Sequence, residues 1–262
     1  MKKKKIITLL LVAITTILMI AGCSKEEKNS LERVIESGKL TVVGSGGYPP
    51  FNYMEEGKVV GFDVEVGSEI ASRLGVELNY VTSDWDGLIE GLRNKRYDAI
   101  LGSMAITDAR LEVVDFSVPY YYSGAQLFAH VDSGFISAKE LNEKKIAVAT
   151  GTNFVEDANA LGAEAVYYQD DNATLMELIT KRVDGVITDR LVGLQAMKEI
   201  AGGEKIQMVD SLLRLENMGI AFHKDDVELL EEVNKILEEM HADGTMTAIS
   251  QKWMDGVDIT VQ

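Results

Sequence analysis

Cysteine is almost absent from this sequence: Cys23 is the only one in 262 residues. A disulfide framework and a zinc site built from paired cysteines are therefore excluded. Histidine is scarce too, with three residues and no HExxH pair, and the acidic pairs at 170–171 and 225–226 lack the glycine and spacing of a calcium loop. The glycine-rich segment 44–51 has no lysine to serve a nucleotide phosphate. We predict no metal and no cofactor.

Basic residues are also few, because 26 Lys and Arg stand against 42 Asp and Glu, a net charge of −16. Such an acidic surface repels phosphate backbones, which argues against nucleic acid as a partner. Long apolar runs are limited to residues 6–20, so no second segment of membrane-spanning length is present. The folded body must therefore be held together by packed cores rather than by disulfides or lipid.

The N-terminus carries a sorting signal. Four lysines precede the apolar run, and Ala21 and Gly22 stand directly before Cys23. The pattern predicts a signal peptide at 1–22, and it resembles a bacterial lipobox, in which the cysteine is lipidated and becomes the mature N-terminus. The alternative is an ordinary signal peptide that contains a cysteine by chance. We interpret the polar segment 23–30 as a tether between lipid and folded body.

Beyond the tether, strand and helix patterns alternate. Val66, Ile70 and Leu74 recur every fourth residue and Gly75 follows, which predicts a helix that ends there. A late amphipathic helix near 229–240 must pack back on an earlier part of the chain. Further strands are expected at 40–47, 76–81, 97–104, 145–151, 165–169 and 183–189, and further helices near 88–92, 153–161 and 172–181. Two successive βα sets predict an α/β fold with two lobes.

The body of the chain resembles the polar amino-acid-binding family of bacterial solute-binding proteins, which serve ABC-type importers. The resemblance runs in the right order through YPPFNY (48–53), GFDVEV (61–66), WDGLIEGL (85–92), YDAILGSMAITDARLEVVDFSVPYY (97–121), VATGTNF (148–154), VDGVITD (183–189) and the closing NMGIAF and GTMTAISQKWM. It implies a two-lobed periplasmic-binding-protein fold of type II, in which two βα lobes are joined by two crossing strands and the ligand is held in the cleft.

The resemblance also implies where the lobes begin and end. The crossing strands are expected near 119–126 and 214–219. Lobe 1 would then comprise 31–122 and 219–262, and lobe 2 would comprise 123–218. The implied partners are a free amino acid, an ABC permease and its ATPase, with the binding protein itself a monomer.

Residues 102–110, GSMAITDAR, place small residues before a single arginine. Small residues let a backbone approach a ligand closely, and a guanidinium binds a carboxylate through two parallel hydrogen bonds. In the family that this chain resembles, the arginine matching Arg110 binds the α-carboxylate of the amino acid. Spacing alone favours a different interpretation, a surface arginine paired with Asp108 or Glu112.

Ser103, Met104 and Ala105, which precede this arginine, also belong to the predicted site. The resemblance implies that backbone N–H groups at Ser103 and Ala105 assist in binding the carboxylate, with Met104 between them. The family commonly has threonine or serine at the position of Ala105. Alanine keeps the N–H group and loses the hydroxyl, so one hydrogen bond of about 1–1.5 kcal/mol is absent.

In the second lobe, Asp189 matches the family position that receives the α-ammonium group. It also precedes a helical pattern, so a helix N-cap is the plain alternative, and both roles are compatible. Residues 150–153 form a strand-to-helix turn, whose free N–H groups attract carboxylates. We expect ligand contact at Thr152 and at either Ala149 or Asn153, with simple capping as the alternative.

Tyr48 and Trp85 match positions whose side chains flank the ligand in the family. An aromatic face also stabilises a nearby ammonium by about 0.5–2 kcal/mol. The alternative places both rings in the core of lobe 1. Ser45 stands where relatives selective for basic amino acids carry aspartate, which argues mildly against lysine, arginine or ornithine as ligand.

Within the family, the segments 151–154, 167–172 and 188–191 most resemble cystine-binding members. Arg190, directly after the expected ammonium-binding aspartate, is the most suggestive residue, although a surface position on the following helix explains it equally well. Cystine, or another polar amino acid, is therefore the expected ligand.

Two rival functions use the same fold. A periplasmic dehydratase acting on prephenate or arogenate needs a general acid over the leaving hydroxyl, and the residues after Asp189 add no carboxylate. A sensor adaptor that presents ligand to a separate receptor is the other alternative. We predict a binding protein that is not an enzyme and lies outside the cytoplasm, anchored by a lipid on Cys23.

Overall fold

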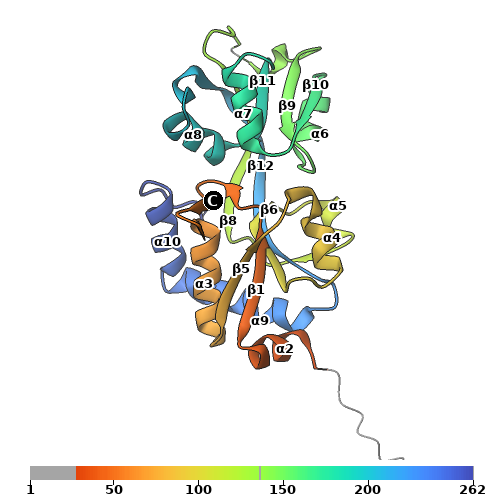
Figure 1. The fold of residues 1–262 in the computed structure, drawn as a ribbon, viewed down its shortest axis with the longest axis vertical. Helices are drawn as coiled ribbons and strands as arrows, with labels where there is room; N and C mark the ends of the chain where they lie inside the picture. The colour runs from red at the N-terminus through yellow and green to blue at the C-terminus, as the bar shows by residue number, and fades with distance from the viewer. Residues whose placement is uncertain (1–27, 136, 262) are drawn as a thin grey trace, which may run out of the picture.

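The computed structural model describes residues 28–135 and 137–261. The predicted signal peptide (1–22), the lipidation site Cys23 and the first part of the tether lie outside these residues. Figure 1 shows two bodies stacked along the long axis of the molecule and joined by a narrow waist. We call the body that contains the first strand lobe 1 and the other body lobe 2.

Lobe 1 is built on parallel strands. β1 (Lys39–Gly44) pairs in parallel with both β5 (Glu77–Thr82) and β6 (Ala99–Ala105). Every residue of β6 is buried, as expected for a parallel strand covered on both faces. A separate small antiparallel sheet of β2 (Gly47–Tyr48), β3 (Asn52–Glu55) and β4 (Lys58–Val60) lies beside it.

The helices of lobe 1 come from both ends of the chain. They are α2 (Ser30–Ser37), α3 (Phe62–Leu74), α4 (Leu88–Arg93), α5 (Asp108–Leu111), α9 (Val227–Ala242) and α10 (Thr245–Trp253). Gly75 ends α3 in the left-handed conformation, as its place in the pattern predicts.

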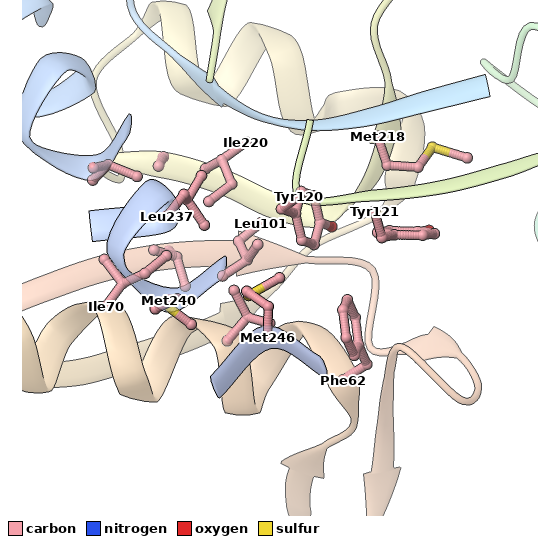
Figure 2. Close-up of a cluster of buried hydrophobic side chains, with 14 of the residues drawn as sticks. Phe62, Ile70, Leu101, Tyr120, Tyr121, Met218, Ile220, Leu237, Met240 and Met246 are labelled. Atoms are coloured by element: carbon pink, nitrogen blue, oxygen red, sulfur yellow. The ribbon is translucent and has the colours of Figure 1, made fainter. Parts of the chain in front are cut away.

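The late helix α9 packs back on lobe 1. Its Leu237 and Met240 lie with Ile70 of α3 and Leu101 of β6 in one buried cluster (Figure 2). Each such side chain stabilises the fold by about 1.5–3 kcal/mol through burial. The cluster therefore ties the C-terminal part of the chain to the first strands.

Lobe 2 repeats the same construction. Its strands are β9 (Lys145–Ala149), β10 (Glu164–Tyr168) and β11 (Gly185–Asp189), and its helices are α6 (Phe154–Ala160), α7 (Asp171–Ile179) and α8 (Arg190–Glu199). Alternate residues of β9 serve opposite faces. Ile146 and Val148 enter one core and Ala147 enters another, so the sheet is covered by helices on both sides.

Two long strands, β8 (Tyr121–His130) and β12 (Ile206–Phe222), run through the waist and pair antiparallel with each other. A single mixed sheet therefore passes through both lobes in the order β10-β9-β11-β8-β12-β6-β1-β5, and the short β7 (Asp115–Phe116) pairs with β12. The register of β12 shifts between Val209 and Arg214 and again between Gly219 and Ala221. The waist consists of two hydrogen-bonded strands rather than loose linkers.

Candidate functional site

A cavity of about 500 Å³, counting its space open to solvent, lies between the lobes at the waist. From lobe 1 and its end of β12 it is lined by Ser45, Gly47, Tyr48, Trp85, Ser103, Ala105, Arg110 and Met218. From lobe 2 and the neighbouring part of β12 it is lined by Ala149, Thr152, Asn153, Phe154, Gln169, Asp170, Asp171 and Glu216.

The cavity brings together all the residues that we expected at the site except Met104 and Asp189. Met104 is 1% exposed and packs in a core cluster with Val43 and Leu88. Its neighbours on β6 face the cavity because successive side chains of a strand point to opposite sides. The side chain of Met104 therefore does not line the cavity.

Arg110 is a buried cation. It lies in the short helix α5, which is capped by Thr107, and its Nη1 donates to the carbonyl oxygen of Ala105 at 2.8 Å. The guanidinium lies 5.6 Å from the centre of the Trp85 ring, a cation–π contact. Among the described residues no carboxylate lies within 4 Å of it, so the alternative of a surface ion pair with Asp108 or Glu112 is wrong.

Burial lowers the pKa of Arg110, and the opposite charge of Glu216 is the largest influence that counters this. A buried guanidinium is costly unless an anion and hydrogen-bond acceptors surround it. The arrangement suits a carboxylate that comes from a bound molecule.

The backbone N–H of Ser103, which we expected to bind the ligand carboxylate, is used within the protein. Its φ of 58° is unusual for a residue other than glycine, and its N–H donates to the Tyr120 hydroxyl at 3.1 Å. The Ser103 hydroxyl donates to the Asp63 carboxylate at 2.9 Å. In this conformation the N–H and the hydroxyl of Ser103 both donate within the protein, so its N–H group is not free for a ligand carboxylate.

Asp63 is the centre of a hydrogen-bond network behind Ser45 and Ser103 in the cavity wall. Its buried carboxylate accepts hydrogen bonds from Tyr120 at 2.7 Å, from Asn52 at 2.8 Å and from Ser103. Asn52 in turn accepts from the N–H of Gly46 at 2.9 Å, next to Ser45. Burial raises the pKa of Asp63 to about 6, against the lowering effect of its donors. The network fixes the backbone on which Ser45 and Ser103 stand.

Asp189 ends β11 and caps α8, as the alternative interpretation held. Its Oδ1 accepts from the N–H of Leu191 at 2.7 Å and of Val192 at 3.4 Å. Its Oδ2 is buried. Burial raises the pKa of Asp189 to about 7, although the neighbouring Ser123 hydroxyl lowers the pKa of this carboxyl group. The residue lies behind the cavity wall, because its side chain is fully buried and does not line the open space.

Tyr48 lies close to this acidic side. Burial raises the pKa of its hydroxyl well above the ordinary value, and the charges of Asp189, Asp171 and Glu216 raise it further. The ring stacks on Phe51 at 5.7 Å between ring centres. Tyr48 therefore serves as part of the core and as a cavity wall at once.

The turn between β9 and α6 forms the opposite wall. The hydroxyl of Thr152 donates to the carbonyl oxygen of Ala149 at 2.7 Å, and the amide of Asn153 donates to Glu216 at 2.5 Å. Gly151, with φ of 79°, lies so near lobe 1 that an added Cβ would be 3.2 Å from Asp86. The turn is held by its own hydrogen bonds and touches lobe 1 directly.

Several lining residues were not predicted from the sequence, above all Glu216, Met218 and the segment 169–171. Asp170 caps α7 through the N–H of Ala173, and Asp171 accepts from the Thr188 hydroxyl at 2.5 Å. Burial raises the pKa of Asp171 to about 6. The acidic segment 167–172 stood out in the sequence, but nothing in its pattern placed it at the cavity.

Within residues 28–135 and 137–261, His, Asp and Glu side chains form no group of three that could hold a metal ion. In the same residues no helix is both long and apolar enough to cross a membrane.

Comparison with known proteins gives consistent matches along the chain. Residues 40–256 match the model of the bacterial extracellular solute-binding proteins, family 3. The L-cystine-binding protein TcyJ of Escherichia coli (strain K12) is 34% identical over 258 residues, covering 95% of this chain and 96% of that protein. The arginine-binding extracellular protein ArtP of Bacillus subtilis (strain 168) is 31% identical over 254 residues, covering 95% and 97%.

Among solved structures, the ancestral amino acid-binding protein AncCDT-1, described as a precursor of cyclohexadienyl dehydratase, superposes with a TM-score of 0.80 at 30% identity. The match covers 86% of this chain and 100% of that one. These likenesses confirm the predicted fold class of two α/β lobes joined by two crossing strands.

Proposed function

Because this chain belongs to family 3 of the bacterial extracellular solute-binding proteins, we propose that it is the lipid-anchored substrate-binding component of an ABC-type amino-acid importer. The observation that carries the proposal is Arg110, a buried cation without a carboxylate partner among the described residues, in a cavity between two lobes. The α-carboxylate of a free amino acid is the anion that this site takes.

Binding proceeds by closure. The amino acid first meets Tyr48, Trp85 and Arg110 of lobe 1, and lobe 2 then swings over it about β8 and β12. Contacts between the lobes support such a closed form, since the amide of Asn172 donates to the carbonyl oxygen of Gly47 at 3.3 Å and Gly151 touches lobe 1. Closure buries both charges of the amino acid, so both must find partners.

Cystine is the ligand that we propose. TcyJ, a relative over nearly the whole chain, is named as an L-cystine-binding protein. Asp170 and Asp171 line the cavity near Ser45 and Gly47, where Asn172 joins the lobes, and could face a second ammonium group. Arginine is the alternative, because ArtP is named as arginine-binding and the same acidic wall would suit a guanidinium.

We also propose that the protein binds its ligand without catalysing a reaction. In this proposal it is a monomer anchored by a lipid on Cys23, and its partners are a permease and the ATPase of that permease. The matched relatives are named as binding proteins. The dehydratase alternative rests on the name of one structural neighbour, and the sensor adaptor on the fold alone.

The test is a thermal-shift panel on ligand-stripped protein with L-cystine, the common amino acids and prephenate. At a 100-fold excess over its Kd, a ligand adds about 2.7 kcal/mol and raises Tm by roughly 5–10 °C in a protein of this size. A shift with one amino acid supports the proposal. A shift with prephenate alone, together with its turnover, would replace it with the dehydratase.

Arg110→Ala should remove the shift, because the ligand carboxylate would be buried without a counter-charge at a cost of several kcal/mol. Arg96→Ala, at an exposed position of lobe 1, is the matched control and should leave the shift unchanged. Near-normal amino-acid affinity in the Arg110 variant would contradict the proposed site.

A further inference from the structure

Two opposite charges line the cavity without touching each other. Arg110 comes from α5 and Glu216 from β12, and both side chains are buried, with Glu216 4% exposed. The two charges are close enough to interact, because the negative charge of Glu216 raises the pKa of Arg110 against the lowering effect of burial. In the described part of the chain they form no ion pair, because the ion pairs of Glu216 run to Arg214 alone.

Both groups are held apart by other contacts. Arg110 is fixed by the Ala105 carbonyl oxygen and the Trp85 ring. The Oε1 atom of Glu216 accepts from Nη1 of Arg214 at 2.7 Å and from the amide of Asn153 at 2.5 Å. A cation and an anion fixed across a cavity are complementary to a molecule that carries the same two charges in the opposite order.

One oxygen of Glu216 has no donor. Its Oε2 atom is buried and makes no hydrogen bond in residues 28–135 and 137–261. Leaving a buried acceptor unsatisfied costs about 1–3 kcal/mol, and more for a charged group. Arg214 does not supply the missing donor, because its Nε and Nη2 atoms bind Asp157 at 3.2 and 2.7 Å. No donor reaches Oε2 from the residues that the structure describes, and a molecule bound in the cavity can supply one.

We propose that Oε2 of Glu216 accepts a hydrogen bond from the α-ammonium group of the bound amino acid while Arg110 binds its α-carboxylate. The inference rests on the proposed function and adds a specificity-determining residue to it. An ammonium group has three donors, so one of them can satisfy the buried Oε2 atom of Glu216. Glu216 thus selects ligands with a protonated α-amine over hydroxy acids and keto acids of the same shape.

The decisive variant is Glu216→Gln. The glutamine oxygen can still accept from Arg214 and Asn153, while an NH₂ group replaces Oε2 and turns an acceptor toward the ligand into a donor. Glu156→Gln is the matched control, because Glu156 is an exposed acid of α6 that also acts electrostatically on Arg110 and does not line the cavity.

Calorimetric titrations of the full-length protein in detergent would compare each amino acid with its analogue lacking the α-amine. The probes are L-cystine against 3,3′-dithiodipropionic acid, and L-arginine against its α-hydroxy analogue. The ratio of the two affinities is independent of the folded fraction, because only folded protein binds either member of a pair. A purely structural role for Glu216 would weaken both members equally and leave the ratio unchanged.

We expect Glu216→Gln to lower the preference for the amino acid at least 10-fold and Glu156→Gln to keep it within twofold. A Glu216→Gln preference within twofold of the unmodified protein overturns the role of Glu216. If Arg110→Ala abolishes binding in that case, the proposed function still stands. If the unmodified protein binds neither amino acid, the proposed ligands fall, and the role of Glu216 falls with them.

Discussion

Buried carboxyl groups around the cavity predict how the stability of this protein responds to pH. Burial raises the pKa of Asp189 to about 7 and of Asp63 and Asp171 to about 6, above the ordinary value of 3.8. Between pH 4 and 7 the folded chain therefore holds protons that the unfolded chain has released. The free energy of unfolding consequently falls as pH rises through this window.

For Asp189 we predict that the ligand-free protein melts at a higher temperature at pH 5 than at pH 7.5. Asp189→Asn keeps an oxygen to cap α8 but cannot ionise, so its Tm should fall less over the same interval. Differential scanning calorimetry at the two pH values measures both slopes. Asp84→Asn, at an exposed position, should keep the original slope, and equal slopes in all three proteins would contradict the assignment.

Ala105 offers a second test at the level of one residue. Its methyl group lines the cavity beside Arg110, where a hydroxyl would find a ligand carboxylate. Ala105→Ser should tighten amino-acid binding by about 1 kcal/mol, a five- to tenfold lower Kd by calorimetry. Unchanged or weaker binding would show that the carboxylate does not lie against this residue.

At the level of elements, close packing explains several glycines of this sequence. Gly193 in α8 lies against the fully buried ring of Phe128 in β8, and an added Cβ would fall 2.1 Å from a ring atom. A ring in a filled core cannot move aside freely. The absence of a side chain at Gly193 is thus what lets α8 lie on the sheet and place Asp189 at its N-terminus.

Gly193→Ala should accordingly destabilise the protein by about 1–3 kcal/mol, the usual cost of overpacking, in chemical denaturation. Gly87→Ala provides the comparison, because the space around Gly87 is open and its φ of −91° suits alanine. Equal stability of the two variants would mean that α8 shifts at little cost.

The strand and helix periods were sufficient to predict most elements. The expected helix of Val66, Ile70 and Leu74 is α3, and the strand expected at 183–189 is β11. The small sheet of β2, β3 and β4 was not predicted, because strands of two to four residues are too short to show a period.

The candidate site was less accessible to sequence reasoning. Arg110 stood out only through the family resemblance, since its spacing favoured a surface ion pair. Glu216 was missed because a single acid in a strand looks like a residue of the solvent face. Whether it faces a cavity depends on how Asn153 and Arg214 meet it, a packing of segments far apart in the sequence.

At the scale of the whole molecule, one ion pair at the rim joins the lobes. Lys198 of α8 lies 2.5 Å from Asp255, which follows α10 of lobe 1, and both side chains are exposed. Exposed pairs contribute little and are screened by salt. The pair nevertheless adds attraction only when the lobes are together, so it favours the closed form.

Lys198→Glu should therefore weaken amino-acid binding by about two- to fivefold at low ionic strength, with the difference shrinking in high salt. Titration calorimetry at two salt concentrations measures this. Lys235→Glu, which breaks a pair with Glu232 inside α9, should leave the affinity unchanged. A salt-independent loss in the Lys198 variant would exclude electrostatic attraction as the cause.

The return of the chain to lobe 1 has a consequence for the order of folding. Lobe 2 takes its own strands and helices from one continuous stretch, whereas lobe 1 needs α9 and α10, and the carbonyl oxygen of Ile259 accepts from the N–H of Tyr122. During synthesis the first strands of lobe 1 must therefore wait, with their apolar faces uncovered, until α9, α10 and Ile259 have been made. Lobe 1 is thus completed only after all the strands and helices of lobe 2 have been synthesised.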